Sequence, residues 1–178
     1  EKLSSDIETD VAIIGAGFSG LWTAYYLKKL MPNSRIVIID ANEVGFGASG
    51  RNGGWCSGFM PNSIDELAEL HGREAAIEMY RQSFATLDEI ESVLVNENID
   101  CDFHRGGTIC GATNSVQASR VTSEITKFHD FGFTEDDIRQ LSQSEVERRI
   151  NVSNLQLASY TPHCAVIHPA KLVNGLAR

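Results

Sequence analysis

The chain has 178 residues, of which 42% are hydrophobic and 22% are charged, and its formal net charge is −9. This composition is typical of a folded globular protein, and the length allows one well-cored domain or parts of two. The negative charge argues against DNA or RNA as a partner. No apolar run approaches the ~20 residues that span a bilayer, so we expect no transmembrane segment.

The first forty residues predict a strand, a helix and a second strand. The apolar run Val11–Ile14 indicates the first strand, and the β-branched run Arg35–Ile39 indicates the second. Between them, residues 18–30 predict a helix that ends before Pro32, which cannot continue it. The apolar face of this helix comprises Phe18, Leu21, Trp22, Tyr25 and Tyr26.

Three glycines follow the first strand in the pattern G-x-G-x-x-G. Gly15 permits a tight turn, Gly17 lets a phosphate approach the backbone, and Gly20 lets the helix pack closely on the strand. The helix N-terminus offers unpaired N–H groups and a positive dipole end to a pyrophosphate. Asp40 stands twenty residues beyond Gly20, where the fingerprint places a carboxylate that accepts a ribose hydroxyl. The motif predicts a dinucleotide site; the alternative is a βαβ unit with an ordinary glycine-rich turn.

The loop after Asp40 helps to separate flavin from nicotinamide sites. Gly45–Gly54 contains five glycines in ten residues, so we expect it to be irregular. A nicotinamide dehydrogenase usually passes from its acidic strand end into a helix. This loop instead offers Ser49, Arg51 and Asn52, which can wrap a second polar portion of one extended ligand. The alternative is a flexible exposed loop with a hydrated Arg51.

The rest of the chain predicts helices mixed with short strands. Acidic residues in Glu135–Asp137 indicate the first turn of a helix. The capping box Ser63–Glu66 predicts the start of a helix that Gly72 ends in an αL cap, and a second helix is expected over about 73–97, with an apolar face formed by Ala76, Tyr80, Phe84, Leu87 and Leu94. Next we expect a strand over Asp102–Gly111, with a turn or bulge at Gly106-Gly107, and a helix near 115–131 that Gly132 ends. The box Ser142…Glu145 predicts a helix near 143–150, which is followed by a strand over Gln156–Tyr160 and by a helix that begins at Pro169 and runs to Arg178.

These motifs resemble a known family. Gly15–Gly20, Ala24, Asp40 and Gly47–Gly54 are similar to the amino-terminal part of the FAD-dependent D-amino acid oxidase-like amine oxidoreductases. The Ser-Gly-Arg-Asn-Gly-Gly form is most similar to the gamma-glutamylputrescine oxidase branch. Ala165–Val173 resembles the turn that returns the chain from the substrate lobe to the FAD lobe. The resemblance implies an α/β fold: a Rossmann-like FAD-binding βαβ unit with an incomplete parallel sheet, and part of a mixed α+β substrate lobe.

The resemblance also implies FAD as cofactor and a small amine or amino acid as substrate. A C–H next to the amine nitrogen delivers hydride to the flavin, so no general base from this chain is required. Asp40 is then expected at the adenosine ribose, and Arg51 or Asn52 near the flavin. The implied cofactor-binding residues are Gly15, Gly17, Phe18, Ser19, Gly20, Asp40, Ala41, Gly47, Ala48, Ser49, Arg51, Asn52, Gly53 and Gly54.

The resemblance divides the chain into four segments. These are residues 1–60 of the FAD-binding domain, a helical connection over 61–98, part of the substrate lobe over 99–162, and the start of the return to the FAD domain over 163–178. Chains of the family are longer, so we expect an amino-terminal fragment that is inactive alone. Two other functions stay open: a non-catalytic nucleotide-binding fragment, and a nicotinamide-dependent dehydrogenase, which leaves the glycine-rich loop unexplained.

Several side chains outside the loop have two interpretations. Trp55 either stacks near the flavin ring or packs in the core, and Cys56 either attaches the flavin or is a buried thiol. His104 and Arg105 either face a substrate or form a surface turn. The cysteines show no C-x-x-C spacing, so we expect reduced thiols in a cytoplasmic protein, with neither disulfides nor a metal site. They are Cys56, Cys101, Cys110 and Cys164.

Overall fold

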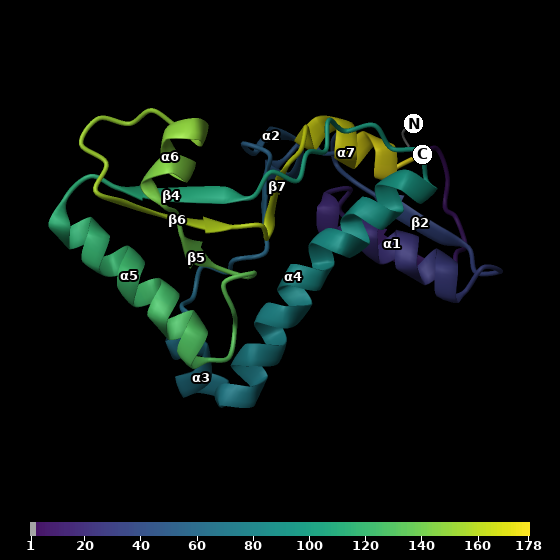
Figure 1. The fold of residues 1–178 in the computed structure, drawn as a ribbon. Coiled ribbons are helices and arrows are strands. Elements are labelled where there is room, and N and C mark those ends of the chain that lie inside the picture. The colour runs from purple at the N-terminus through teal and green to yellow at the C-terminus, as the bar shows by residue number, and fades with distance from the viewer. Residues whose placement is uncertain (1–2) are drawn as a thin grey trace. The chain divides into compact units, whose positions relative to one another are not determined.

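The computed structural model describes residues 3–178, which form two compact units (Figure 1). Unit 1 contains the chain up to Gly54, Val93–Phe103 and Ile167–Arg178. Unit 2 contains Trp55–Ser92 and His104–Val166. The division into four segments concerns the domains that the resemblance implies, and it stays a prediction.

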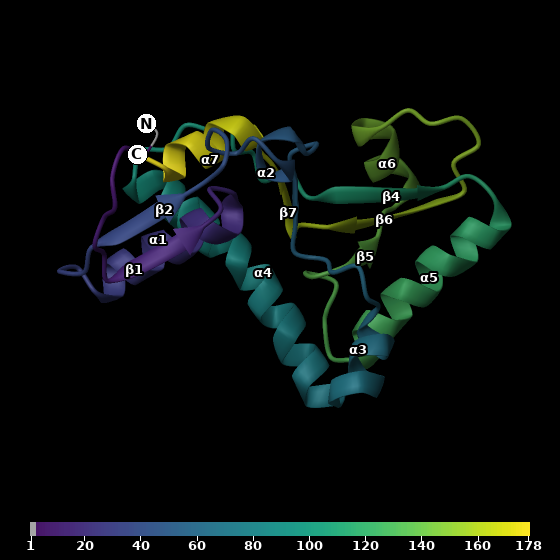
Figure 2. The same cartoon turned by 180° about the vertical axis from the view of Figure 1, so that it is seen from behind.

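Unit 1 is built on the predicted βαβ element. Strands β1 (Val11–Ile14) and β2 (Ile36–Ile39) pair in parallel, with Val11 opposite Ile36, and helix α1 (Phe18–Leu30) connects them (Figure 2). The second strand begins one residue later than predicted. On α1, Leu21 is buried, whereas three aromatic side chains of the predicted face are half-buried and pack on one another with ring centroids 5.1 to 5.8 Å apart; they are Trp22, Tyr25 and Tyr26.

The glycine-rich loop is not wholly irregular, and that expectation is wrong for one stretch. Helix α2 (Ala48–Arg51) forms a single turn. The Asn52 amide stabilises it by donating to the carbonyls of Ala48 at 3.1 Å and Ser49 at 3.0 Å, which satisfies two acceptors at its carboxyl end. A side-chain cap thus outweighs the low helix propensity of the loop.

Unit 1 also contains the return segment. Helix α7 (Pro169–Leu176) begins with proline at its first position, as predicted, and ends before Arg178. Its amino-terminal cap is His168, whose Nδ1 accepts the Lys171 N–H at 3.3 Å. The last turn of α4 (Arg73–Asn96) belongs to this unit as well, whereas Arg73–Ser92 lie in unit 2.

Unit 2 contains two small antiparallel sheets. In the first, β6 (Leu157–Thr161) is the central strand between β4 (Thr108–Ala112) and β5 (Arg139–Gln140). In the second, β3 (Trp55–Ser57) pairs with β7 (Cys164–Val166). Strand β4 begins later than the predicted strand, and the sequence patterns did not indicate β3, β5 or β7.

The helices of unit 2 are close to their predicted ranges. They are α3 (Ile64–His71), α4, α5 (Ser115–Asp130) and α6 (Gln143–Arg149). Both capping boxes are present: Ser63 Oγ accepts the Glu66 N–H at 3.3 Å, and Glu145 accepts the Ser142 N–H at 2.9 Å.

Two local expectations in unit 2 are wrong. Gly72 ends α3 with φ of 90° and ψ of 155°, which is a positive φ outside the αL region. Glu135–Asp137 form a turn and not a helix. The Asp137 carboxylate accepts the Thr134 N–H at 2.8 Å, so a local turn takes the hydrogen bond that a helix start would use.

The core of unit 2 is aromatic. Tyr80 and Phe84 of α4 pack with Phe128 of α5 and with Phe133, with ring centroids 5.0 to 6.2 Å apart. Helix α5 contacts both β4 and β6 and slopes at an angle to them in Figure 1. The predicted apolar face of α4 is confirmed, because Ala76, Tyr80, Phe84, Leu87 and Leu94 are all buried.

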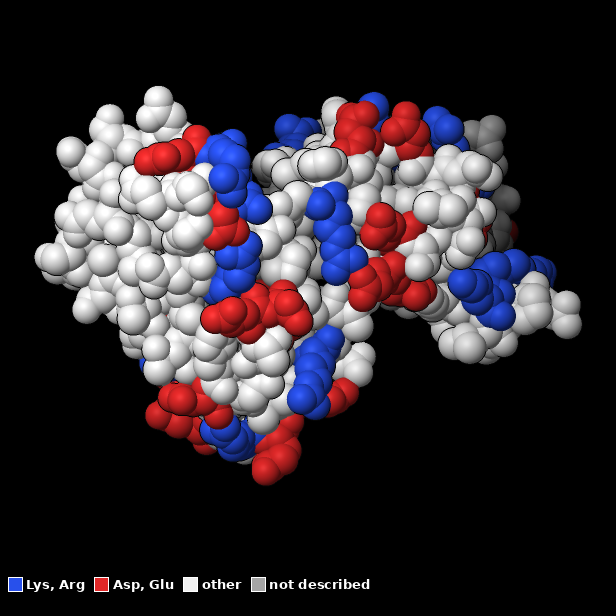
Figure 3. All heavy atoms as spheres, viewed as in Figure 1, with Lys and Arg blue, Asp and Glu red and all other residues white. Residues whose placement is uncertain are grey.

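Charged side chains of both signs are interspersed on the face shown in Figure 3. Some form ion pairs, such as Lys127 with Asp65 and Arg105 with Asp88. Among residues 3–178, no helix combines the length and the apolar character needed to cross a membrane.

Candidate cofactor-binding site

The amino terminus of α1 is open to a ligand. Its cap residue, Gly17, has no side chain to satisfy the first N–H groups, which have no acceptor within the helix. One of them, on Phe18, donates to Ser49 Oγ at 2.9 Å. The Ser49 hydroxyl, on α2, therefore lies at the positive end of the α1 dipole, where an anion is stabilised.

The three glycines have the separate roles that the motif predicts. Gly15 turns the chain with φ of +107°. A Cβ on Gly20 would lie 2.0 Å from the Gly15 carbonyl oxygen, so only glycine allows this approach of helix to turn. A Cβ on Gly17 would lie 2.9 Å from Ser49 Oγ, so a side chain there would occupy the space in front of the helix terminus.

Asp40 lies at the end of β2 with its carboxylate exposed. One carboxylate oxygen accepts the Ala16 N–H at 2.7 Å, and the other accepts the Asn42 N–H at 2.8 Å. These two bonds, the Ala16 bond first, lower the pKa of Asp40, so the group is a carboxylate at neutral pH. Each oxygen keeps a further lone pair that can accept a ribose hydroxyl.

Arg51 and Asn52 make different contacts in the loop. The Arg51 Nε donates to the Phe46 carbonyl, and the guanidinium lies 4.6 Å from the centre of the Phe46 ring. The Asn52 side chain donates from its Nδ2 to two carbonyls of α2, and its Oδ1 accepts the Gly54 N–H at 2.9 Å. The Arg51 side chain is exposed, whereas Asn52 holds the loop in shape.

The other predicted residues also lie in unit 1. Phe18 is half-buried on α1, and Gly54 is buried where the loop ends. Five positions are exposed and present backbone or small side chains to solvent: Ser19, Ala41, Gly47, Ala48 and Gly53. The structure therefore brings α1, the end of β2 and α2 together, while the assignment of each residue to FAD stays a prediction.

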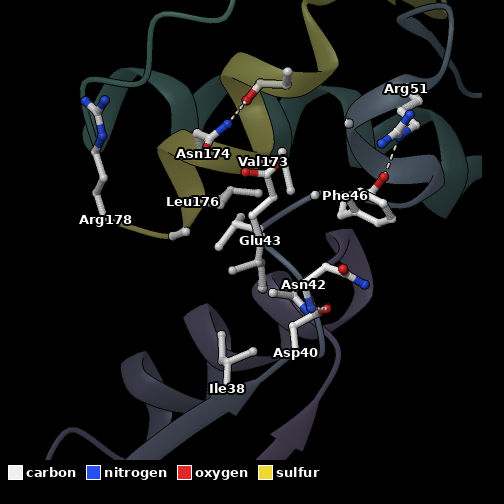
Figure 4. A pocket seen from close by; sticks show the side chains of 17 residues that line it. Ile38, Asp40, Asn42, Glu43, Phe46, Arg51, Val173, Asn174, Leu176 and Arg178 are labelled. Carbon is white, nitrogen blue, oxygen red and sulfur yellow. Dashed lines mark hydrogen bonds between the residues drawn. The ribbon is translucent and has the colours of Figure 1, made fainter. Parts of the chain in front are cut away.

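A cavity of about 930 Å³ in unit 1 adjoins Asp40. Figure 4 shows side chains of α7 on one side of it and Asp40 at the end of β2 on the other, with Glu43 between them. Sequence reasoning missed several lining residues, which are Ile38, Asn42, Glu43, Phe46, Val173, Asn174, Leu176 and Arg178. The resemblance implies that residues 163–178 return to the FAD domain, but it does not name the side chains of α7 that line the cavity, because these contacts join segments far apart in the chain.

The structure decides between some of the pairs of interpretations that the sequence left open. The core-packing interpretation of Trp55 is wrong, because the side chain is 68% exposed and its Nε1 donates to Thr108 Oγ1 at 3.3 Å. Cys56 is half-buried, His104 is exposed, and Arg105 pairs with acidic side chains of α4. All four cysteines are free thiols, and the described residues contain no cluster of ligands suited to a metal ion.

The sequence model of the FAD dependent oxidoreductases matches residues 10–178. The chain belongs to the FAD-dependent oxidoreductase family. Gamma-glutamylputrescine oxidoreductase of Escherichia coli is 27% identical over 177 residues, which cover 99% of this chain and 40% of the relative. The probable oxidoreductase OrdL of Rhizobium meliloti is 29% identical over 171 residues, 96% of this chain and 39% of the relative. The chain thus spans about 40% of the length of these members.

Solved structures of similar proteins show the same fold. Glycine oxidase from Bacillus cereus superposes with a TM-score of 0.72 at 21% identity, over 96% of this chain and 43% of the enzyme. L-amino acid deaminase from Proteus myxofaciens, in complex with anthranilate, has a TM-score of 0.75 at 16% identity, over 99% and 37%. The predicted α/β fold class and the predicted family are therefore confirmed, with FAD as the cofactor of the family.

Proposed function

We propose that the protein oxidises the C–N bond of a small amine or amino acid by hydride transfer to FAD. Family membership supports the chemistry, and the names of the relatives support the substrate class: a gamma-glutamylputrescine oxidoreductase, a glycine oxidase and an L-amino acid deaminase. The observation that carries the proposal is the meeting of Ser49 and Asp40 at the open α1 terminus: Ser49 Oγ accepts the Phe18 N–H, and Asp40, which lines the cavity together with Ala16, accepts the Ala16 N–H.

The chain would bind and orient the cofactor. Bound FAD supplies the hydride acceptor. The first N–H groups of α1 would donate to the pyrophosphate, and Ser49 can donate its own O–H to the same anion while it accepts from Phe18. Asp40 would accept a ribose hydroxyl, and exposed Arg51 would meet a polar part of the ligand. This donor set fits an extended dinucleotide.

The substrate reaction balances without a base from this chain. The carbon next to the amine nitrogen loses a hydride, the nitrogen lone pair forms a C=N bond, and the nitrogen sheds a proton to water. Water then hydrolyses the imine to a carbonyl compound and a free amine or ammonia. We assign no catalytic residue in the described part of the chain, because the cofactor carries the electrons.

Because this chain spans about 40% of the length of its relatives, the test uses a purified protein of their full length that contains it, and its absorption spectrum is measured. We expect the bands of oxidised flavin, which an amine bleaches under anaerobic conditions. The probes are an N-acylated diamine and glycine, one for each substrate type named by the relatives. A protein that stays colourless after incubation with FAD contradicts the proposal and leaves a non-catalytic nucleotide-binding protein. Turnover with NAD and no flavin favours a nicotinamide dehydrogenase.

A variant at the helix terminus locates the site. Gly17→Val should abolish FAD retention, because its side chain would fill the space beside Ser49 Oγ. Ala12→Val is the matched control, since it adds a branched side chain at an exposed position on β1 and should retain FAD. Retention of FAD by Gly17→Val, with the fold intact by circular dichroism, would place the cofactor elsewhere.

The location and domain organisation are also proposals. The free thiols support a cytoplasmic location, because such thiols persist in reducing compartments. Cell fractionation with an antibody to the protein tests it. The four-segment division is supported by the position of the predicted cofactor residues in unit 1, and limited proteolysis tests its boundaries.

A further inference from the structure

Helix α7 contributes the side chain of Val173 to the cavity beside Asp40, where this side chain is only 1% exposed (Figure 4). Gly45, in the loop after β2, is buried, has φ of +69° and lines the same cavity. A Cβ on Gly45 would lie 2.4 Å from Val173 Cγ1 and 3.2 Å from Val173 Cγ2. The branched end of Val173 therefore packs directly against the Gly45 backbone.

The Gly45 backbone connects three parts of the candidate site. Its N–H donates to the Ala16 carbonyl at 3.0 Å, and the N–H of the same Ala16 donates to the Asp40 carboxylate at 2.7 Å. A Cβ on Gly50 of α2 would lie 2.3 Å from the Gly45 carbonyl oxygen, so α2 packs on another side of the same residue. A shift of Gly45 would therefore disturb the glycine turn, the Asp40 carboxylate and α2 together.

Val173 is itself held in place, because α7 is fixed by the segment that follows α4. A Cβ on Gly175 would lie 2.4 Å from Ile99 Cγ2, so this side chain packs on the helix backbone. Lys171 Nζ donates to the Asp102 carboxylate at 2.8 Å. Both contacts lie within unit 1. Since a β-branched side chain on a helix also has one strongly preferred χ1 rotamer, Val173 presents a rigid surface to Gly45.

We propose that Val173 is a positioning residue of the FAD site, and that it acts through Gly45. By holding Gly45, it fixes the Ala16 peptide, and with it the Asp40 carboxylate that would accept a ribose hydroxyl beside the α1 terminus that would bind the pyrophosphate. A site whose groups are held before the ligand arrives loses less conformational freedom on binding. This inference rests on the proposed function and adds a residue that lies far from the glycine motif in the sequence.

Two substitutions separate the shape of Val173 from its contribution to stability. Val173→Ala removes both Cγ atoms, so Gly45 is free to shift, and the affinity for FAD should fall by about tenfold or more. Val173→Thr keeps two branches on Cβ and should keep the affinity within about threefold, although its buried hydroxyl also lowers stability. Flavin fluorescence, titrated into the apo form of the full-length protein that contains this chain, measures both affinities.

Amide hydrogen exchange of the same apo protein examines the loop without any ligand. The Gly45 N–H, which donates to the Ala16 carbonyl, should exchange faster in Val173→Ala than in Val173→Thr. The amides that pair β1 with β2 report the opening of unit 1 as a whole. The difference between the variants at Gly45 should exceed any difference at these amides, which a purely structural role of Val173 would not produce.

The outcomes distinguish this inference from the proposed function. If the unchanged protein binds FAD but Val173→Ala and Val173→Thr lose the same affinity, or if Gly45 exchanges no faster than the β1–β2 amides allow, Val173 is not a positioning residue and the proposed function stands. An unchanged protein that binds no FAD overturns both. Where Val173→Ala fails to fold, Val173→Leu takes its place: it stays apolar but moves the branch from Cβ to Cγ, and it should weaken the affinity for FAD more than Val173→Thr does.

Discussion

Gly20 has the tightest steric surroundings among the glycines of the candidate site. A Cβ there would lie 2.0 Å from the Gly15 carbonyl oxygen and 3.3 Å from Ile13 Cγ2. Gly20→Ala should therefore lower the free energy of unfolding by about 1–3 kcal/mol, because backbone has to move to admit the methyl group. Urea denaturation measures the change.

Gly47→Ala is the matched control for this steric argument. Gly47 has φ of −78°, and a Cβ there would meet nothing within 4 Å. Its substitution should be neutral or slightly stabilising, since alanine restricts the unfolded chain. Equal destabilisation by both substitutions would mean that contact with Gly15 is not the cause.

At Asp40, hydrogen bonding sets a pH dependence. The carboxylate accepts N–H groups of Ala16 and Asn42, and these bonds lower its pKa in the folded state. The stability they contribute is present above the unfolded pKa of about 3.9 and is lost as the pH falls through the lower folded value. Asp40→Asn should therefore be less stable than the unchanged protein at neutral pH, and this difference should shrink in acid.

Denaturation curves across the acid range measure this difference. Glu43→Gln is the control, because Glu43 is exposed and its side-chain carboxylate accepts no hydrogen bond among residues 3–178. It should show no comparable difference at any pH. If the Asp40→Asn difference stays constant below about pH 4, the carboxylate does not contribute through these bonds.

At the scale of single elements, prediction succeeds where the signal is local. The capping boxes at Ser63 and Ser142 place the starts of α3 and α6, since the bonding residues lie within one turn. Strands β3 and β7 have three residues each and exist because they pair with each other. Such pairing leaves no periodic pattern in either segment, so sequence reasoning missed it.

The capping box of α3 gives an element-scale prediction. Ser63→Ala removes the acceptor of the Glu66 N–H and should destabilise the protein by about 1 kcal/mol without changing the urea m-value. Thr122→Ala, at an exposed position inside α5, is the control and should cause no loss, because alanine is the better helix former. A similar loss in both variants would argue against the cap.

At the scale of the whole molecule, the candidate site was only half predictable. The glycine motif, Asp40 and Ser49 follow one another in the first third of the chain and match a known fingerprint. Val173 and Asn174 of α7 line one side of the cavity, and they come after all the residues of unit 2 in the sequence. No propensity or spacing encodes that return, because it depends on tertiary packing.

The connectivity of the two units predicts how a cofactor affects stability. The chain passes between the units after Gly54, Ser92, Phe103 and Val166, so unit 1 consists of three separate segments. Unfolding of unit 2 releases the segments of unit 1 from their closed loops and raises their entropy. We therefore expect one cooperative transition, in which a ligand bound in unit 1 also stabilises unit 2.

Two buried thiols test this coupling. Cys101 lies in unit 1 and Cys164 in unit 2, and both are at most 2% exposed. FAD at one hundred times its dissociation constant should raise the free energy of unfolding by about 2.7 kcal/mol, since it binds only the folded protein. Labelling of both thiols should slow together as FAD is added. Protection of Cys101 alone would show that the units unfold independently, and that the cofactor stabilises only the unit that contains the glycine motif.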